Sequence, residues 1–171
     1  MKKIYQTIID KESGNCMQAT IASLFNKELN DVPNFIEYGQ LCYDKMEEYI
    51  NSLGYTISGM LWNKNYNRLV DPTYACFRKE KWHTPSMLTY KNLKQYDGID
   101  GYFMASVLSP RYFNYGSGFN NSHCVICDSK CNIVHDPNPE NVNIIKYPLS
   151  SLLNYGGVIN ITLIKKNENY E

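Results

Sequence analysis

A chain of 171 residues is long enough for one domain with its own hydrophobic core, and we expect residues 1–171 to form a single domain. Lysine and arginine together number 17, as do aspartate and glutamate, so the formal net charge is zero. This balance argues against a surface made for nucleic acid or anionic membranes, and no apolar run approaches the length of a membrane span.

The cysteine content indicates a reducing environment. Residues 1–6 include two lysines, but no apolar region of the kind that a signal peptide needs follows them. Six cysteines without an export signal are therefore expected to be free thiols in the cytoplasm.

The first predicted elements are a short extended segment at 4–9, which contains Gln6, and a tight turn that leads at once into a helix. Asn15 is a suitable N-cap, and Gln18 lies three residues later, where a capping-box partner would stand. Apolar residues at helical spacing should face the core: Met17, Ile21, Leu24 and Phe25.

Cys16 falls in the first turn of this helix. Backbone N–H groups there lack intrahelical partners, and the helix dipole is positive. Both features favour the thiolate, which is the nucleophilic form of the side chain. Thr20 and Ser23 share the face of Cys16 and are small enough to leave the thiol open. The alternative is that Cys16 is a small buried hydrophobic residue, as many free cysteines are.

The remaining elements follow in chain order. Pro33 blocks helix continuation, and Gly54 is a natural end for a second helix. The region 63–97 has the weakest pattern and is interpreted as an insertion. The elements predicted around it are a helix at about 40–53, strands at 55–62 and 101–108, a hairpin of strands at 122–128 and 131–135, a short helix at 147–155 and a strand at 158–165. A helix followed by antiparallel hairpins predicts the α+β class.

A nucleophilic cysteine needs a base, and the base needs a group that orients it. His123 opens the strand at 122–128, directly after a loop. Asp136 follows the partner strand, and Pro137 fixes the backbone after it. Because the ends of hairpin strands lie close together, His123 and Asp136 can meet. Either residue alone is a common strand-end or turn residue, whereas the pair on one hairpin is more specific.

This order of residues resembles the papain-like cysteine peptidase clan. The matching stretches are most similar to C39-type and related small bacterial and phage proteins, and they are Gly14-Asn15-Cys16, His123-Cys-Val-Ile and His135-Asp136-Pro137. The resemblance covers residues 1–35 and roughly 101–165. It implies a papain-like fold, in which the N-terminal helix that carries the cysteine packs on an antiparallel β-sheet. A phage source would place the protein in the host cytoplasm.

The resemblance also implies a function, a hydrolase that cleaves a peptide or other amide bond. Cys16 would be the nucleophile, His123 the general base and Asp136 the orienting acid. Gln6 would line the oxyanion hole together with the Cys16 N–H. No cofactor is expected, and the partner would be a peptide or protein substrate, with no nucleic acid and no membrane. A non-catalytic binding protein on the same fold is the alternative.

The loop before His123 is interpreted as a lid over the site. Aromatic residues among its glycines offer apolar contact surface, and Arg111 has the donor geometry to grip a carboxylate. Arg111 and Tyr115, with Asn15 beside the nucleophile, are the candidate substrate-binding residues. The alternative is that the aromatic residues are core and that Arg111 is a solvated surface charge.

A zinc site is a further alternative, because four residues of zinc-ligand type follow one another: Cys124, Cys127, Cys131 and His135. On a strand, however, Cys124 and Cys127 point to opposite faces, and the Val-Ile between them is a poor turn. We therefore predict no metal and interpret these cysteines as core residues. His135 is a reserve candidate for the base, but it directly precedes Asp136 and should point to the opposite face.

Overall fold

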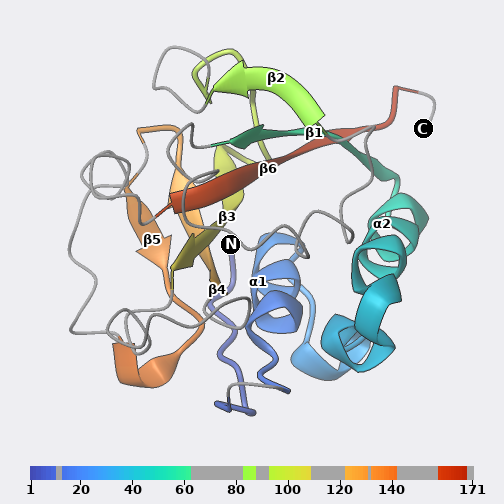
Figure 1. Cartoon of the computed structure of the whole chain (residues 1–171), viewed down its shortest axis with the longest axis vertical. Helices are drawn as coiled ribbons and strands as arrows, with labels where there is room; N and C mark the ends of the chain where they lie inside the picture. Colours follow the sequence, from blue (N-terminus) through green and yellow to red (C-terminus); the bar gives the residue numbers. More distant parts are fainter. Residues whose placement is uncertain are drawn as a thin grey trace.

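The computed structural model describes residues 1–10, 13–62, 83–87, 93–108, 122–130, 132–141 and 158–168. Within these ranges, two α-helices and one six-stranded sheet form an α+β fold, so the predicted class is confirmed (Figure 1). The helix expected at 147–155 and the loop expected to act as a lid lie outside the described residues.

The helical elements come first in the chain. They are α1 (Cys16–Leu24), the 3-10 helices η1 (Leu29–Asp31) and η2 (Phe35–Leu41), and α2 (Cys42–Ser52). Every residue of α1 after Cys16 is buried, so this helix lies inside the molecule rather than on its surface. In α2 only one face is buried, and Gly54 follows it with a φ of 81°, a conformation that glycine adopts without strain.

The sheet contains six described strands in the order β2-β1-β6-β3-β4-β5. Their bounds are β1 (Tyr55–Trp62), β2 (His83–Met87), β3 (Tyr102–Leu108), β4 (Ser122–Asp128), β5 (Ile133–His135) and β6 (Val158–Lys166), and η6 (Pro139–Asn141) follows β5. Five strands pair antiparallel, and β2 joins the edge of β1 in parallel. The strands predicted at 55–62 and 122–128 are confirmed at both ends.

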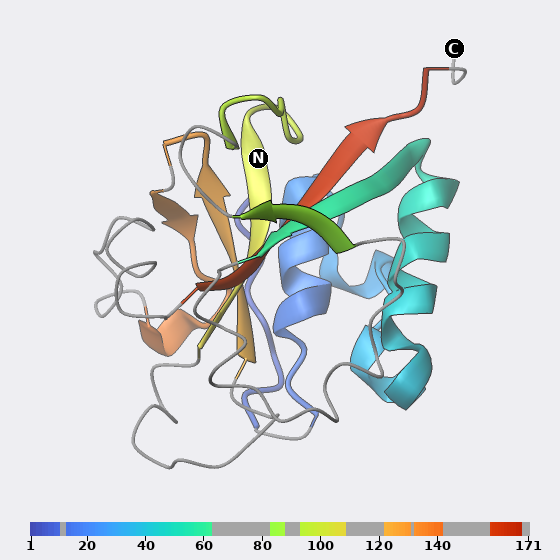
Figure 2. The ribbon, with the colours of Figure 1, turned by 45° about the horizontal axis from the view of Figure 1, so that its top comes forward.

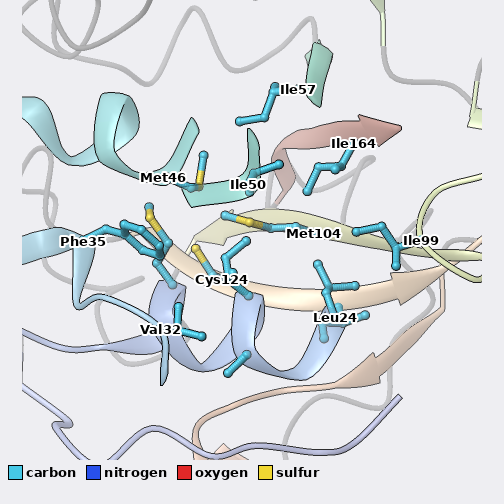
Figure 3. Close-up of a cluster of buried hydrophobic side chains, with 14 of the residues drawn as sticks. Leu24, Val32, Phe35, Met46, Ile50, Ile57, Ile99, Met104, Cys124 and Ile164 are labelled. Carbon is cyan, nitrogen blue, oxygen red and sulfur yellow. The ribbon is translucent and has the colours of Figure 1, made fainter. Parts of the chain in front are cut away.

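Both helices pack against the sheet, α1 on β3 and β4 and α2 on β1 (Figures 1 and 2). One hydrophobic cluster fills the space between helices and strands, and Figure 3 shows Phe35, Met46 and Met104 within it. Alternate strand residues, such as Phe103 and Val125, form a second cluster that does not include these helices. Since burying one large apolar side chain contributes about 1.5–3 kcal/mol, the first cluster holds α1 firmly against β4.

The described helices are all too short or too polar to cross a membrane. This finding concerns only the part of the chain that the structure describes.

Candidate active site

Gly14 allows the turn that leads into α1. A Cβ atom at this position would lie 2.6 Å from the backbone oxygen of Asp10, closer than real Cβ contacts come. The Asp10 carboxylate also accepts a hydrogen bond from the Ser13 N–H at 2.6 Å. These contacts fix where α1 begins and therefore where Cys16 lies.

Asn15 occupies the N-cap position of α1, but its side chain makes no capping hydrogen bond, so the predicted capping box is wrong. Its Oδ1 instead accepts hydrogen bonds from the Thr7 N–H at 3.0 Å and the Ile8 N–H at 2.9 Å. Its Nδ2 donates to Gln18 Oε1 at 2.8 Å. Asn15 is only 2 % exposed, and these bonds tie the N-terminal segment to the start of the helix. The substrate contact expected of Asn15 stays a prediction.

Cys16 is the first residue of α1 and is partly exposed. Thr20 and Ser23 are fully buried, and the Ser23 hydroxyl donates to the Ala19 carbonyl at 2.8 Å. That the small size of these two neighbours leaves the thiol open stays a prediction. The Cys16 N–H belongs to the first turn, where the helix itself offers no acceptor.

His123 and Asp136 form a buried hydrogen bond. His123 Nε2 lies 2.6 Å from Asp136 Oδ1, and the side chains of both residues are less than 10 % exposed. β4 and β5 are hydrogen-bonded neighbours, so the start of β4 and the residue after β5 come together as the hairpin argument predicts.

The loop after β5 fixes the Asp136 carboxylate. Asp136 Oδ1 also accepts a hydrogen bond from the Asn138 N–H at 2.8 Å, and the Asn138 side chain accepts one from the Glu140 N–H at 3.0 Å. The Pro137 carbonyl accepts a hydrogen bond from the Gln6 N–H at 2.9 Å. The N-terminal segment therefore joins two parts of the site. It bonds Asn15 at the start of α1, and through Gln6 it bonds the loop that holds Asp136.

The Cys16 thiol completes the constellation. Interactions with the side chains of Cys124 and His123 lower the pKa of Cys16 well below its usual value, even though burial acts in the opposite direction. Since Asp136 occupies Nε2 of the ring, Nδ1 is the nitrogen left for the thiol. The start of α1 adds a positive dipole beside the sulfur.

His123 is a strong base in this setting. Burial alone would lower its pKa, but the hydrogen bond to Asp136 and the contact with Cys16 outweigh burial and raise the pKa to about 10. A lowered thiol pKa beside a raised imidazole pKa favours a thiolate–imidazolium pair at neutral pH. The site can therefore present an anionic sulfur and a proton donor together.

Gln6 lies in the segment between these two parts of the site and is 7 % exposed. Its Nε2 donates to the Ile8 carbonyl at 3.2 Å, and the same carbonyl accepts the Asn15 N–H at 3.2 Å. The carboxamide of Gln6 is therefore near the residue that precedes Cys16. Its Oε1 has no hydrogen-bond partner among the described residues.

Cys124 was not expected at the site. It was interpreted as a core residue, and it does lie in the cluster between the sheet and the helices (Figure 3), but its thiol also lowers the pKa of Cys16. Strand alternation predicts that His123 and Cys124 point to opposite faces, yet both contact Cys16. The sequence shows that Cys124 directly follows the base. Whether this brings its thiol to the site depends on where α1 begins.

Two other sequence interpretations can be placed. His135 lies away from Cys16: its Nε2 is 2.7 Å from the Ile4 carbonyl, and its ring meets Tyr5 edge-on. Cys124 and Cys127 pack in clusters on opposite faces of the sheet, which prevents them from sharing one tetrahedral ion. No group of three or more metal-ligating side chains occurs among the described residues.

Arg111, Tyr115 and Cys131 lie outside the described residues. The substrate-binding roles expected of Arg111 and Tyr115 stay predictions.

Comparison with models of protein families, with curated proteins and with solved structures finds no match. The functional argument therefore depends on the geometry of the site rather than on relatives.

Proposed function

We propose that the protein is a papain-like thiol hydrolase that cleaves a peptide or other amide bond. The observation that carries this proposal is the buried His123 ring, which lies 2.6 Å from Asp136 Oδ1 and whose pKa is also raised by the neighbouring Cys16 thiol. A nucleophile, a base and an orienting group joined in this way form the constellation used in acyl transfer to cysteine.

The chemistry follows from the charges at rest. The Cys16 thiolate attacks the amide carbon, the carbonyl π electrons move to the oxygen, and the His123 imidazolium gives its proton to the leaving nitrogen. The C–N bond breaks, and a thioester remains on Cys16. Water then attacks this thioester while neutral His123 accepts a proton, which releases the acid and restores the thiolate–imidazolium pair.

The negative oxygen of the tetrahedral intermediate needs hydrogen-bond donors. The Cys16 N–H is one candidate because it belongs to the first turn of α1. The Gln6 carboxamide is the other, because Nε2 has a second hydrogen beyond the one donated to Ile8. Removing one such donor typically reduces kcat by about 100- to 1,000-fold.

The arrangement of the elements also supports the proposal. A buried helix carries the nucleophile at its start and packs on antiparallel strands, one of which carries the base (Figure 2). This is the arrangement that the papain-like resemblance implies. The expected substrate is accordingly a peptide or a protein.

The test compares wild-type protein with the Cys16→Ala and His123→Gln variants. Alkylation by iodoacetamide at about pH 6, well below the usual thiol pKa of about 8.5, is mapped to individual cysteines by mass spectrometry. Wild-type Cys16 should react fastest of all cysteines, and His123→Gln should slow it markedly. Hydrolysis of a mixed peptide-amide library, followed by mass spectrometry, should occur with the wild type and stop in Cys16→Ala.

Slow alkylation of Cys16 in folded wild-type protein would contradict the proposal. It would favour a binding protein in which the three residues serve structure alone. Thermal melting of each variant is the control that separates lost chemistry from lost folding.

A further inference from the structure

A row of polar side chains crosses the side of the sheet that faces the helices. Cys124 lies directly opposite Ser106 in the register of β4 and β3, and Ser106 lies directly opposite Asn160 in the register of β3 and β6. Residues that lie directly opposite one another point to the same face of a sheet. Because Cys124 belongs to the hydrophobic cluster between the sheet and the helices (Figure 3), Ser106 and Asn160 face the helices as well. Both are buried, with 6 % and 3 % of their surface exposed.

This row begins beside the proposed nucleophile. Cys16 packs against the cluster to which Cys124 belongs, and Cys124 directly follows His123 in β4. Adjacent strands lie about 4.8 Å apart, so Ser106 and Asn160 lie about 5 and 10 Å from Cys124 across the sheet. These distances place the two side chains within reach of a substrate residue next to the bond that Cys16 attacks, and not of the bond itself.

Asn160 has a buried carboxamide oxygen without a partner. None of the described residues donates a hydrogen bond to its Oδ1. A buried acceptor that has given up its bond to water and gained no other is unfavourable, and such atoms are rare in folded proteins. A donor from a bound substrate would satisfy this oxygen.

A β-bulge next to Asn160 is a second, independent observation. Ser106 pairs with Asn160, but the next residue of β3, Val107, pairs with Val158, so β6 has one residue more than β3 at this point. Bulges re-aim side chains and are over-represented next to active sites. The sheet is therefore irregular at the position from which Asn160 points toward the helices.

The chemistry of the row favours a neutral polar partner. The Ser106 hydroxyl can donate a hydrogen bond, and Asn160 Oδ1 can accept one. The next residues on the same face are Met104, Ile126 and Thr162, all uncharged, so a charged side chain would lose its hydration without gaining a counter-ion there. A primary carboxamide carries an acceptor and a donor on one planar group and therefore matches both partners.

We propose that Ser106 and Asn160 form the floor of a subsite that binds a primary carboxamide, the side chain of glutamine or asparagine, in the peptide substrate. This inference deepens the proposed function and rests on it. The Ser106 hydroxyl donates to the carboxamide oxygen of the substrate, and the carboxamide N–H donates to Asn160 Oδ1. Because both floor residues are almost fully buried, only the tip of a substrate side chain meets them. They determine specificity and take no part in the acyl-transfer steps.

The experiment begins with wild-type protein and the mixed peptide-amide library. Mass spectrometry of the products identifies the residues on each side of every cleaved bond, and glutamine or asparagine should be enriched at one fixed position relative to that bond. Three synthetic peptides of one sequence then carry glutamine, glutamate or methionine at this position. The value of kcat/KM should be about 10- to 100-fold higher for the glutamine peptide than for the other two.

Variants of the floor test the assignment through the ratio of kcat/KM for the glutamine and methionine peptides. Asn160→Leu removes the acceptor and should bring this ratio close to one, whereas partial loss of folding would lower both rates alike. Ser106→Ala should reduce the ratio about three- to tenfold, and it decides the matter where Asn160→Leu does not fold. Thr162→Val is the matched control, because it removes a buried hydroxyl from the same face of β6 and should leave the ratio unchanged.

The outcomes separate this inference from the proposed function. Cleavage without enrichment of glutamine or asparagine would overturn the subsite and leave the hydrolase intact, and so would a ratio that stays unchanged in folded Asn160→Leu or in Ser106→Ala. A buried water would then be the partner of Asn160 Oδ1. The absence of any cleavage by the wild type would overturn the proposed function, and the subsite with it.

Discussion

Replacing Asp136 by asparagine should weaken the catalytic base without removing it. The asparagine Oδ1 can still accept from His123 Nε2 and from the Asn138 N–H, which lie 2.6 and 2.8 Å from the present oxygen. What the variant loses is the negative charge. A hydrogen bond to a charged group contributes about 1.5–3 kcal/mol and a neutral one about 0.5–1.5 kcal/mol, so the loss is about 1–1.5 kcal/mol.

This free energy converts directly into a shift of the imidazole pKa. One pKa unit corresponds to about 1.4 kcal/mol, so the pKa of His123 should fall by about one unit from its value of about 10. The equilibrium constant for forming the thiolate–imidazolium pair falls by the corresponding factor of about ten. Amide hydrolysis should therefore slow by no more than about tenfold in Asp136→Asn.

The comparison variant is His123→Gln, which keeps an N–H donor for Asp136 but cannot carry a proton. Glutamine is preferable to alanine here, because a buried carboxylate that loses its cationic partner can destabilise a protein by about 3–5 kcal/mol. His123→Gln should reduce hydrolysis by about 100- to 10,000-fold, the usual contribution of a general acid–base.

Two measurements decide the matter. An NMR titration of the His123 ring gives its pKa in wild-type and Asp136→Asn protein, and hydrolysis of the most reactive library peptide gives the rates. An unchanged His123 pKa in correctly folded Asp136→Asn would refute the electrostatic reasoning. Equal losses of activity in Asp136→Asn and His123→Gln would show that Asp136 does something other than orient the ring.

Three other predictions follow from the same geometry. Cys16→Ala should abolish hydrolysis while melting within a few degrees of the wild type, and residual full activity would refute its role as nucleophile. The rate of hydrolysis should fall as the pH drops through the lowered pKa of Cys16, and it should fall again as the pH rises through about 10, where His123 loses its proton. A rate that already falls as the pH rises through about 6.5, the usual pKa of histidine, would contradict the ion pair. Gly14→Ala should place a Cβ 2.6 Å from the Asp10 carbonyl oxygen and so lower both the melting temperature and the rate of Cys16 alkylation. If both quantities stay unchanged, this turn does not position the nucleophile.

The secondary structure was largely set by local sequence. Alternation of apolar residues identified β1, and helical spacing with Gly54 located α2, because these patterns report which side of an element faces the interior. The turn residues Ser129-Lys130 marked the end of β4. The order of elements also sufficed for the α+β class. The pairing of His123 with Asp136 could be predicted for the same reason, since the two strands of a hairpin bring nearby parts of the chain together.

The long-range contacts were decided only by the tertiary structure. Asn15 looked like a helix cap, but the segment at 6–8 offers it two N–H donors, and no local pattern reports that this segment lies beside the helix start. Cys124 looked like a core residue, and whether its thiol also meets Cys16 depends on how far α1 reaches along β4. The sequence by itself determined the elements and the candidate nucleophile, base and acid, because these depend on residue type and short spacing. The packing of α1 on the sheet decided which side chains surround the sulfur, because that depends on contacts between residues far apart in the chain.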